Sequence, residues 1–270
     1  MKYPVQKLKS FKIRSLGSKT RRPFPRIVVP SFFTLMNLLS GFLSLILVAD
    51  ANLILGAWLI ALAGLFDVLD GVMARLANAQ SEFGVELDSI CDIVSFGVAP
   101  SFLIYHYALY ELSIFGMLLS ALPALCGAVR LARYNVDTRV AYIDYFRGLP
   151  IPGQAIMLAG FTLTFHAGWI FFETMRFGVS TILVPLVVMV SFLMVSTIPF
   201  DKLPPFDRES FRYKKARFIQ FALYMLLILV FQEYGLMLVF GFYVLKGLLT
   251  GGRLFWNDRF GNGEHFVRQN

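Results

Sequence analysis

Cysteine and histidine are scarce in this chain. Its 270 residues include two cysteines and three histidines. Cys91 and Cys126 both fall within long apolar runs and form no metal-ligand spacing, so we expect packed free thiols rather than a disulfide or a redox pair. His106, His166 and His265 are far apart in the sequence. A zinc or thiol site is therefore not expected, and any chemistry must come from other side chains.

Charged residues are also few. They make up 16% of the chain, while 57% of the residues are hydrophobic, and the mean hydropathy is +0.66. A soluble domain has about 25% charged and about 45–50% apolar residues. This composition excludes a soluble globular protein and predicts an all-α, polytopic bundle of membrane helices.

Long apolar runs predict about eight membrane-spanning helices, because a span needs roughly 20 apolar residues. The first six form the predicted catalytic core, and the last two form a short terminal hairpin. The predicted spans are 28–49, 52–75, 88–108, 112–134, 153–172, 178–199, 216–232 and 235–250. The domain organisation is then a basic segment over 1–27, a membrane domain over 28–250 and a tail over 251–270.

The positions of the basic residues predict the orientation. Every Lys and Arg except Arg176 lies in or beside alternate loops of the eight-span arrangement. Cytoplasmic loops retain basic residues, so we expect both termini in the cytoplasm of a multi-pass cell-membrane protein. The net charge of +8 then serves topology and attraction to lipid headgroups rather than nucleic acid. Residues 1–27 form either an interfacial helix or a disordered basic tail.

Four aspartates stand out because carboxylates at the edge of a membrane are costly. They belong to one spaced pattern, Asp67-x2-Asp70-Gly71-x2-Ala74-Arg75-x8-Gly84-x3-Asp88-x3-Asp92. Spacings of three and four place each pair of aspartates on one face of a helix. We read residues 75 to 84 as a short connection between two antiparallel helices. All four carboxylates should therefore meet at the cytoplasmic ends of these helices.

A cluster of four carboxylates needs compensating positive charge, and Arg75 is the only base within the motif. Oxygen ligands select hard ions such as Mg²⁺, Mn²⁺ or Ca²⁺. Two such ions could form the clamp found at phosphoryl-transfer sites. The small residues Gly71 and Ala74 would let a phosphorylated ligand approach the helix, and Arg75 could bind a diphosphate.

The complete motif resembles the signature of the CDP-alcohol phosphotransferase family of integral membrane enzymes, without a departure. The resemblance implies a site with two divalent ions, Mg²⁺ or Mn²⁺, that cleaves a CDP-linked lipid, transfers its phosphatidyl group to an alcohol and releases CMP. It implies further that all four aspartates bind metal, that Asp92 is also the catalytic base, and that the chain forms a homodimer. Its implied CDP-binding residues are Gly71, Ala74, Arg75 and Gly84.

Neighbouring residues resemble the phosphatidylserine synthase branch of that family, in which CDP-diacylglycerol reacts with L-serine. The segments that carry this resemblance are Leu87-Asp88-Ser89, Ser95-Phe96-Gly97-Val98-Ala99-Pro100, Arg130-Leu131-Ala132-Arg133-Tyr134-Asn135 and Phe146-Arg147-Gly148-Leu149-Pro150-Ile151-Pro152. Pro30, Thr34, Asn37 and Gly41 also match the branch. Ser31 departs from it, since Asn is habitual there.

The serine carboxylate needs a cation, and the arginines at the membrane edge can supply one. We expect serine or phosphate binding by Arg130, Arg133, Arg147, Thr34, Asn37 and Ser95. Each assignment has a simpler alternative. The positive-inside rule alone would place these arginines, as it places Arg139. Thr34 and Asn37 would serve equally well as hydrogen-bonding groups between helices.

Two other functions compete with serine transfer. A family member could use glycerol phosphate, inositol phosphate or choline as its acceptor. A cation-coupled transporter would also contain membrane carboxylates, but it predicts acids or broken helices near the midplane and an internal repeat. The motif aspartates cluster at one end of their spans instead, and the two halves show no repeat.

Overall fold

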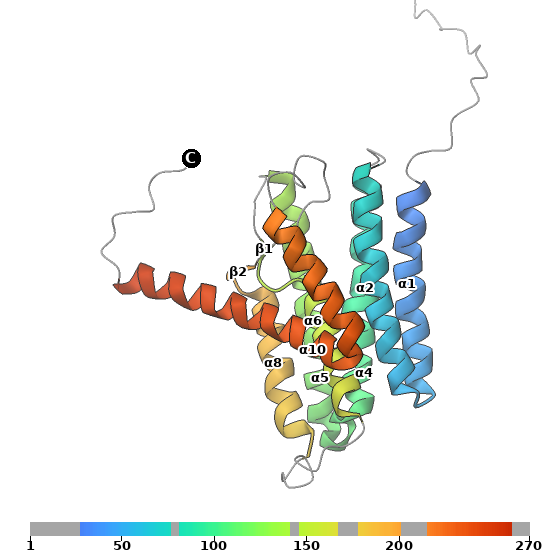
Figure 1. The fold of residues 1–270 in the computed structure, drawn as a ribbon. Coiled ribbons are helices and arrows are strands. Elements are labelled where there is room, and N and C mark those ends of the chain that lie inside the picture. Colours follow the sequence, from blue (N-terminus) through green and yellow to red (C-terminus); the bar gives the residue numbers. More distant parts are fainter. Residues whose placement is uncertain (1–27, 77–80, 141–145, 167–177, 201–214, 261–270) are drawn as a thin grey trace, which may run out of the picture.

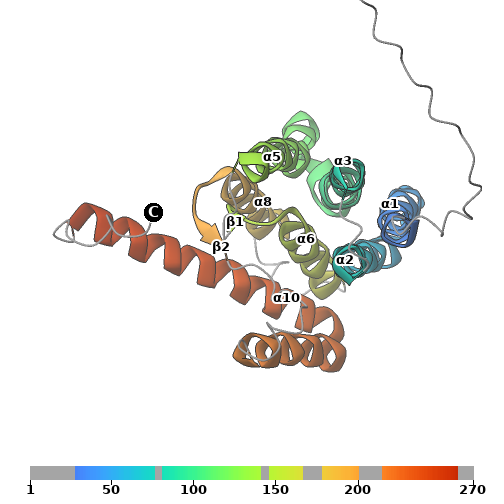
Figure 2. The same cartoon turned by 90° about the horizontal axis from the view of Figure 1, so that it is seen from above.

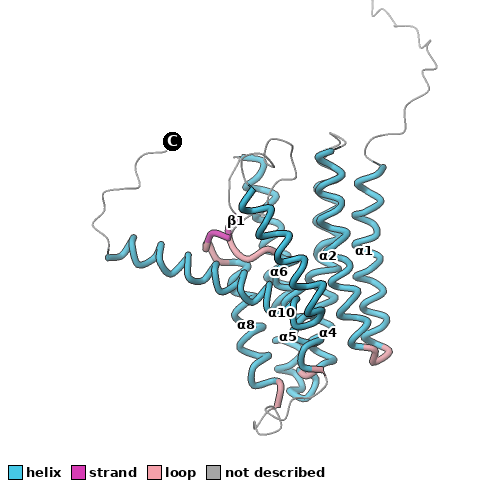
Figure 3. The backbone as a smooth tube through the Cα atoms, viewed as in Figure 1, coloured by secondary structure: helices cyan, strands magenta, loops and turns pink. Residues whose placement is uncertain are grey.

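The computed structural model describes residues 28–76, 81–140, 146–166, 178–200 and 215–260. These residues are almost entirely helical, with short loops and one pair of two-residue strands (Figure 3). The predicted basic segment over 1–27 and residues 261–270 of the predicted tail lie outside this part of the chain. The all-α prediction is confirmed for the described residues.

The described elements are helices, helical turns and two short strands. In chain order they are α1 (Val28–Ala49), α2 (Leu53–Leu76), α3 (Glu82–Asp92), the π-helix η1 (Ile93–Val98), α4 (Ala99–Tyr107), the 3₁₀ turn η2 (Leu109–Leu112), α5 (Ser113–Val140), β1 (Phe146–Arg147), α6 (Ile151–Phe165), α8 (Ser180–Val195), β2 (Pro199–Phe200) and α10 (Lys215–Phe260). The two strands pair antiparallel, with Phe146 opposite Phe200.

Helix α6 forms the centre of the bundle. Seen from above, it lies between α8 and α2 (Figure 2), and it packs against α2 and α10. Nearly all of its side chains are buried, including Leu158 and Phe161. Helices α1 and α2 run side by side at one edge (Figure 1), and α5 packs along α8. Many outward-facing side chains of α1 and α5 are large and apolar, as expected for surfaces in contact with lipid tails.

Within the described residues, five helical segments are long and apolar enough to cross a membrane. They are Val29–Ala49, Leu53–Leu76, Glu82–Tyr107, Leu109–Val136 and Val230–Arg253. Helices α6 and α8 are apolar but shorter, with 15 and 16 residues. The finding supports a membrane protein, and the count of eight spans stays a prediction.

Helix α10 differs from the expected hairpin and tail. Its backbone is non-helical at Gln232 (φ 44°, ψ −112°), close to the predicted break between residues 232 and 235. Beyond the break the helix continues to Phe260, ten residues past the predicted end of the membrane domain. The first ten residues of the predicted tail are therefore helical.

The start of α3 corrects one sequence prediction. We expected the third span to begin at residue 88, with Gly84 in the preceding connection. The helix in fact begins at Glu82, and the Ser81 hydroxyl caps it by accepting a hydrogen bond from the Gly84 N–H at 3.0 Å. A serine at this position satisfies one of the free N–H groups of the first turn. Gly84 therefore lies within the helix that carries Asp88.

Helix α1 packs against both α2 and the α3–η1 segment, and a glycine makes the second contact close. A Cβ atom at Gly41 would lie 2.4 Å from the Ser95 hydroxyl oxygen and 2.7 Å from the Ser95 Cα. Only glycine permits this approach of the two backbones. The contact brings the polar residues of α1 next to those at the end of α3.

Candidate active site

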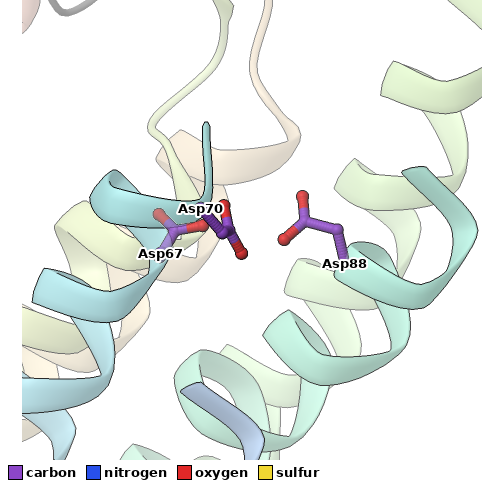
Figure 4. Close-up of side chains that lie close together, drawn as sticks. All are labelled: Asp67, Asp70 and Asp88. Carbon is purple, nitrogen blue, oxygen red and sulfur yellow. The ribbon is translucent and has the colours of Figure 1, made fainter. Parts of the chain in front are cut away.

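Three of the motif aspartates converge between α2 and α3. Asp67 and Asp70 extend from α2, and Asp88 extends toward them from α3 (Figure 4). One carboxylate oxygen from each residue lies within 4.8 Å of the others. The spacing of three in α2 places its two carboxylates on the same face. The predicted meeting of these three side chains is therefore confirmed as geometry.

Two oxygens of this group are buried without a partner. Asp70 Oδ2 and Asp88 Oδ1 accept no hydrogen bond within the described part of the protein. Buried polar atoms are nearly always hydrogen-bonded, so an unsatisfied pair facing a third carboxylate fits a ligand that supplies positive charge. An all-oxygen set of this kind suits Mg²⁺ or Mn²⁺. Asp67, Asp70 and Asp88 are therefore suited to hold a hard divalent ion.

Asp92 lies outside this group of three, one turn further along α3. Its side chain is 6% exposed, and Asn37 Nδ2 donates a hydrogen bond to its Oδ1 at 3.1 Å. Its carboxylate still interacts electrostatically with those of Asp67 and Asp88. The structure thus separates one aspartate, held by an amide, from three aspartates that share a space.

The three polar residues predicted near the acceptor lie at the contacts of α1. Ser95 Oγ donates to the carbonyl of Asn37 at 3.0 Å, and both side chains are fully buried. Asn37 Oδ1 is buried and accepts no hydrogen bond from the described residues. The Thr34 hydroxyl donates to the Pro30 carbonyl at 3.1 Å and lies beside Asp70. Its single proton can serve only one of these acceptors.

The predicted CDP-binding residues lie around the last turn of α2 and the first turn of α3. A Cβ atom at Gly71 would lie 4.0 Å from Nη2 of Arg75, which would be its nearest neighbour. The space over Gly71 is therefore open and has a guanidinium at its edge. Arg75 itself is exposed, Ala74 is half-buried, and Gly84 faces its own cap at Ser81.

Arg130 and Arg133 differ sharply although they are three residues apart on α5. The Arg130 side chain is 5% exposed. Its charge interacts with those of Asp67 and Asp92, and its guanidinium carbon lies 6.0 Å from the centre of the Tyr134 ring. Arg130 therefore places a buried cation near the carboxylates.

Arg133 instead binds the end of α8. Its Nη1 donates to the carbonyl of Val195 at 2.8 Å, and its Nη2 donates to that of Ser196 at 3.1 Å. The last carbonyls of a helix have no partner within the helix, so a cation there stabilises the helix end. The backbone of Arg147 lies in β1, but its side chain is not among the described parts of the structure.

Sequence reasoning missed a link between two of its own motifs. Asn135 Nδ2 donates a hydrogen bond to Ser89 Oγ at 3.0 Å, joining the end of α5 to α3. It also missed Gln154, a fully buried amide whose Nε2 donates to the carbonyl of Phe96 in η1. An amide inside the apolar run of α6 was the available signal.

The comparison with known proteins decides the family. The sequence profile of the family described as CDP-alcohol phosphatidyltransferase matches residues 27–195, more than half of the chain. The chain belongs to this family. The match includes all four motif aspartates and ends at the last residue of α8. Helix α10 lies beyond it.

Individual relatives are similar over much of their length. A CDP-diacylglycerol–serine O-phosphatidyltransferase of Helicobacter pylori is 31% identical over 225 residues, which is 83% of this chain and 91% of the relative. A protein of the same name from Methanocaldococcus jannaschii is 34% identical over 66% of this chain and 76% of the relative. An archaetidylserine synthase of Methanothermobacter thermautotrophicus is 41% identical over 51% of this chain and 59% of the relative.

Proposed function

We propose that this protein is a phosphatidylserine synthase. It transfers the phosphatidyl group of CDP-diacylglycerol to the hydroxyl of L-serine and releases CMP. The observation that carries the proposal is the meeting of Asp67, Asp70 and Asp88 within 4.8 Å, with two buried oxygens that lack partners among the described residues. The names of the relatives, which specify serine as the acceptor, support the same reaction.

The carboxylates would hold two divalent ions, Mg²⁺ or Mn²⁺. Asp67, Asp70 and Asp88 are the proposed ligands, and Asp92 completes the set from the next turn. Such ions, when bound, neutralise the diphosphate and stabilise charge on the departing CMP. The open space over Gly71 takes the diphosphate side of CDP-diacylglycerol, with Arg75 at its edge and Gly84 and Ala74 bordering the nucleotide.

Asp92 is the proposed general base. The amide of Asn37 binds its Oδ1, which fixes the orientation of the carboxylate relative to the other three aspartates. The carboxylate takes the proton from the serine hydroxyl. The serine oxygen then forms a bond to the lipid-side phosphorus, the bond from that phosphorus to the CMP oxygen breaks, and CMP leaves with the electron pair. Positioning and charge neutralisation supply most of the acceleration.

The acceptor site is proposed next to Asp92, on the side of α1 and α5. Arg130 supplies a buried cation for the serine carboxylate or a phosphate oxygen. Asn37 Oδ1, which accepts no hydrogen bond from the part of the chain described, is available to the serine ammonium. Ser95 and Thr34 support this wall from α3–η1 and α1. Arg147 at the start of the α6 connection completes the proposed set, and Arg133 contributes by holding α8.

The membrane arrangement is proposed from the charge pattern. Eight spans, with a six-helix core and both termini in the cytoplasm, place the aspartates at the cytoplasmic edge of the cell membrane. CDP-diacylglycerol reaches such a site from the bilayer, and serine reaches it from water. A homodimer is proposed from the family resemblance alone.

An acceptor panel tests the function. The purified full-length protein, in mixed micelles with CDP-diacylglycerol and Mg²⁺ or Mn²⁺, is assayed for CMP and for lipid products with L-serine, glycerol phosphate, inositol phosphate or choline. We expect metal-dependent CMP release and phosphatidylserine with L-serine. CMP release with a clear preference for another alcohol would overturn the acceptor. No CMP release with any alcohol would overturn the reaction and favour the transporter.

A further inference from the structure

Gln154 occupies an unusual environment for an amide. It lies in the first turns of α6 and is fully buried, with Gly153 and Ala155 beside it in the sequence. Burying an amide without hydrogen bonds is unfavourable, because the group gives up its hydrogen bonds to water. Its Nε2 donates to the backbone carbonyl of Phe96, whereas its Oε1 accepts no hydrogen bond from the described residues. Among the described residues, the amide therefore makes one hydrogen bond, and its partner is a backbone carbonyl.

The partner lies in η1, a wide π-type turn between α3 and α4. The N–H of Ile93 bonds to the Ser89 carbonyl four residues back, and the N–H of Ala99 bonds to the Val94 carbonyl five residues back. This change of pattern inserts one extra residue into the helix. One residue corresponds to about 100° of rotation. The extra residue therefore rotates the side chains of α4 about the helix axis relative to those of α3, which include Asp92. Such turns are rare and are frequently found at functional sites.

The turn is attached on two sides. On one side, Gln154 of α6 holds the Phe96 carbonyl. On the other side, Ser95 Oγ donates to the carbonyl of Asn37 in α1. The side chain of the same Asn37 donates to Asp92, the residue just before η1. Three hydrogen bonds, joined through the backbone between Ser95 and Phe96 and through Asn37 itself, therefore connect the buried amide of α6 to the carboxylate proposed as the base.

We propose that Gln154 is a positioning residue that keeps the wide turn of η1 in place and thereby holds Asp92 in register with Asn37 and with the other three aspartates. It touches neither substrate nor metal. The role rests on the proposed function for its effect on turnover, but its effect on the η1 backbone is independent of any substrate.

Gln154→Met tests the role, because methionine keeps the length and removes the hydrogen bond. The matched control is Thr162→Val on the same helix, which removes a fully buried hydroxyl that donates only to the Leu158 carbonyl of α6 at 3.1 Å. We expect Gln154→Met to lower kcat for serine transfer about 10- to 100-fold, the range seen when a supporting hydrogen bond is lost, with little change in KM for CDP-diacylglycerol. Thr162→Val should stay within about twofold of wild type.

Hydrogen exchange of the full-length protein in detergent, without substrate, provides the second readout. Amides in residues 93–99 should exchange at least tenfold faster in Gln154→Met, while those of α1 and α5 and the melting temperature stay near wild type. If Gln154→Met does not fold, Gln154→Asn, which withdraws the donor by one methylene, should show the same local change.

Unchanged exchange over residues 93–99 would overturn the proposal, as would faster exchange spread equally over the whole chain. Unchanged kcat in an active enzyme would also overturn it. A wild-type protein without transferase activity would contradict the proposed function, and the exchange data would still decide whether Gln154 holds η1.

Discussion

At the facing ends of α2 and α3, buried carboxylate oxygens lie without hydrogen-bond partners among the described residues. At the end of α5, the Arg133 guanidinium donates to backbone carbonyls of α8. Both regions are charged and both lie at the ends of apolar helices. The first region has carboxylate oxygens available to bind a ligand, whereas the guanidinium of the second region is hydrogen-bonded within the fold.

Whether a polar group already has a hydrogen-bond partner within the fold distinguishes binding residues from supporting residues better than residue type does. Asp70 and Arg133 both belong to sequence patterns that resemble an enzyme family. The carboxylates of Asp70 and Asp88 repel each other when both are ionised, so a bound cation would stabilise their arrangement. The contacts of Arg133 neutralise a helix end and are complete as they stand.

Removal of divalent metal should have the largest effect, because the proposed reaction depends on metal bound by the aspartates of α2 and α3. Treatment with EDTA should abolish CMP release, and added Mg²⁺ or Mn²⁺ should restore it. Mn²⁺ should also raise the melting temperature of the metal-free protein, since a ligand that binds only the folded state stabilises it. The same measurement on Asp70→Asn should show a much smaller rise. Full activity after complete metal removal would contradict the metal site.

Replacing the proposed base should have the next largest effect. Asp92→Asn keeps the shape of the side chain but cannot take a proton, so kcat should fall about 10²- to 10⁴-fold. The melting temperature should change little, because the new amide can still accept from Asn37. Asp50→Asn, at the exposed turn after α1, is the matched control and should be fully active. Turnover by Asp92→Asn near the wild-type rate would refute the assignment.

A methyl group at Gly41 should disturb the motif aspartates indirectly, through the contact between α1 and η1. Gly41→Ala would push the Ser95 backbone away from α1, since its Cβ would lie 2.7 Å from the Ser95 Cα. Overpacking of this kind costs about 1–3 kcal/mol, and we expect turnover to fall about tenfold or more. Gly241→Ala in α10, where a Cβ meets nothing within 4 Å, is the control and should leave turnover unchanged. Equal effects of the two changes would argue against a role for the Gly41 contact.

Exchanging arginine for lysine should give the smallest effects and should distinguish the role of Arg130 from that of Arg133. Lysine keeps the charge but loses the planar fork. Arg130→Lys should raise KM for serine or CDP-diacylglycerol about tenfold with an unchanged melting temperature. Arg133→Lys should lower the melting temperature in detergent by a few degrees with an unchanged KM, because hydrogen bonds from a charged group contribute about 1.5–3 kcal/mol. The opposite pattern would reverse the roles that we assign.

The convergence of the aspartates could be predicted because it follows from local rules. Residues three apart on a helix share a face, and a short connection between helices brings their ends together. The start of α3 at Glu82 was predictable in principle from the capping residue Ser81. Hydropathy alone misplaced it, because the first turn of α3 is polar and falls below any apolar threshold.

The support of the site could not be predicted in the same way. Arg130 and Arg133 have the same chemistry and nearly the same position, and only the distant end of α8 gives them different tasks. The wide turn at η1 depends on Gln154, 58 residues from Phe96, and no local propensity marks it. The break at Gln232 was placed correctly, whereas the continuation of α10 to Phe260 depends on residues too polar for a hydropathy window.

The attachment of α8 has a consequence for synthesis. Arg133 binds carbonyls that follow it by 61 to 63 residues, and the N–H of Leu149 donates to another, Leu193, at 3.0 Å. During translation these acceptors do not yet exist when α5 and α6 are made. All four aspartates, Asn37 and Gln154 precede them in the chain. The helix ends that carry these residues can therefore pack together while α8 is still in the ribosome. The packing of α8 then completes the family domain.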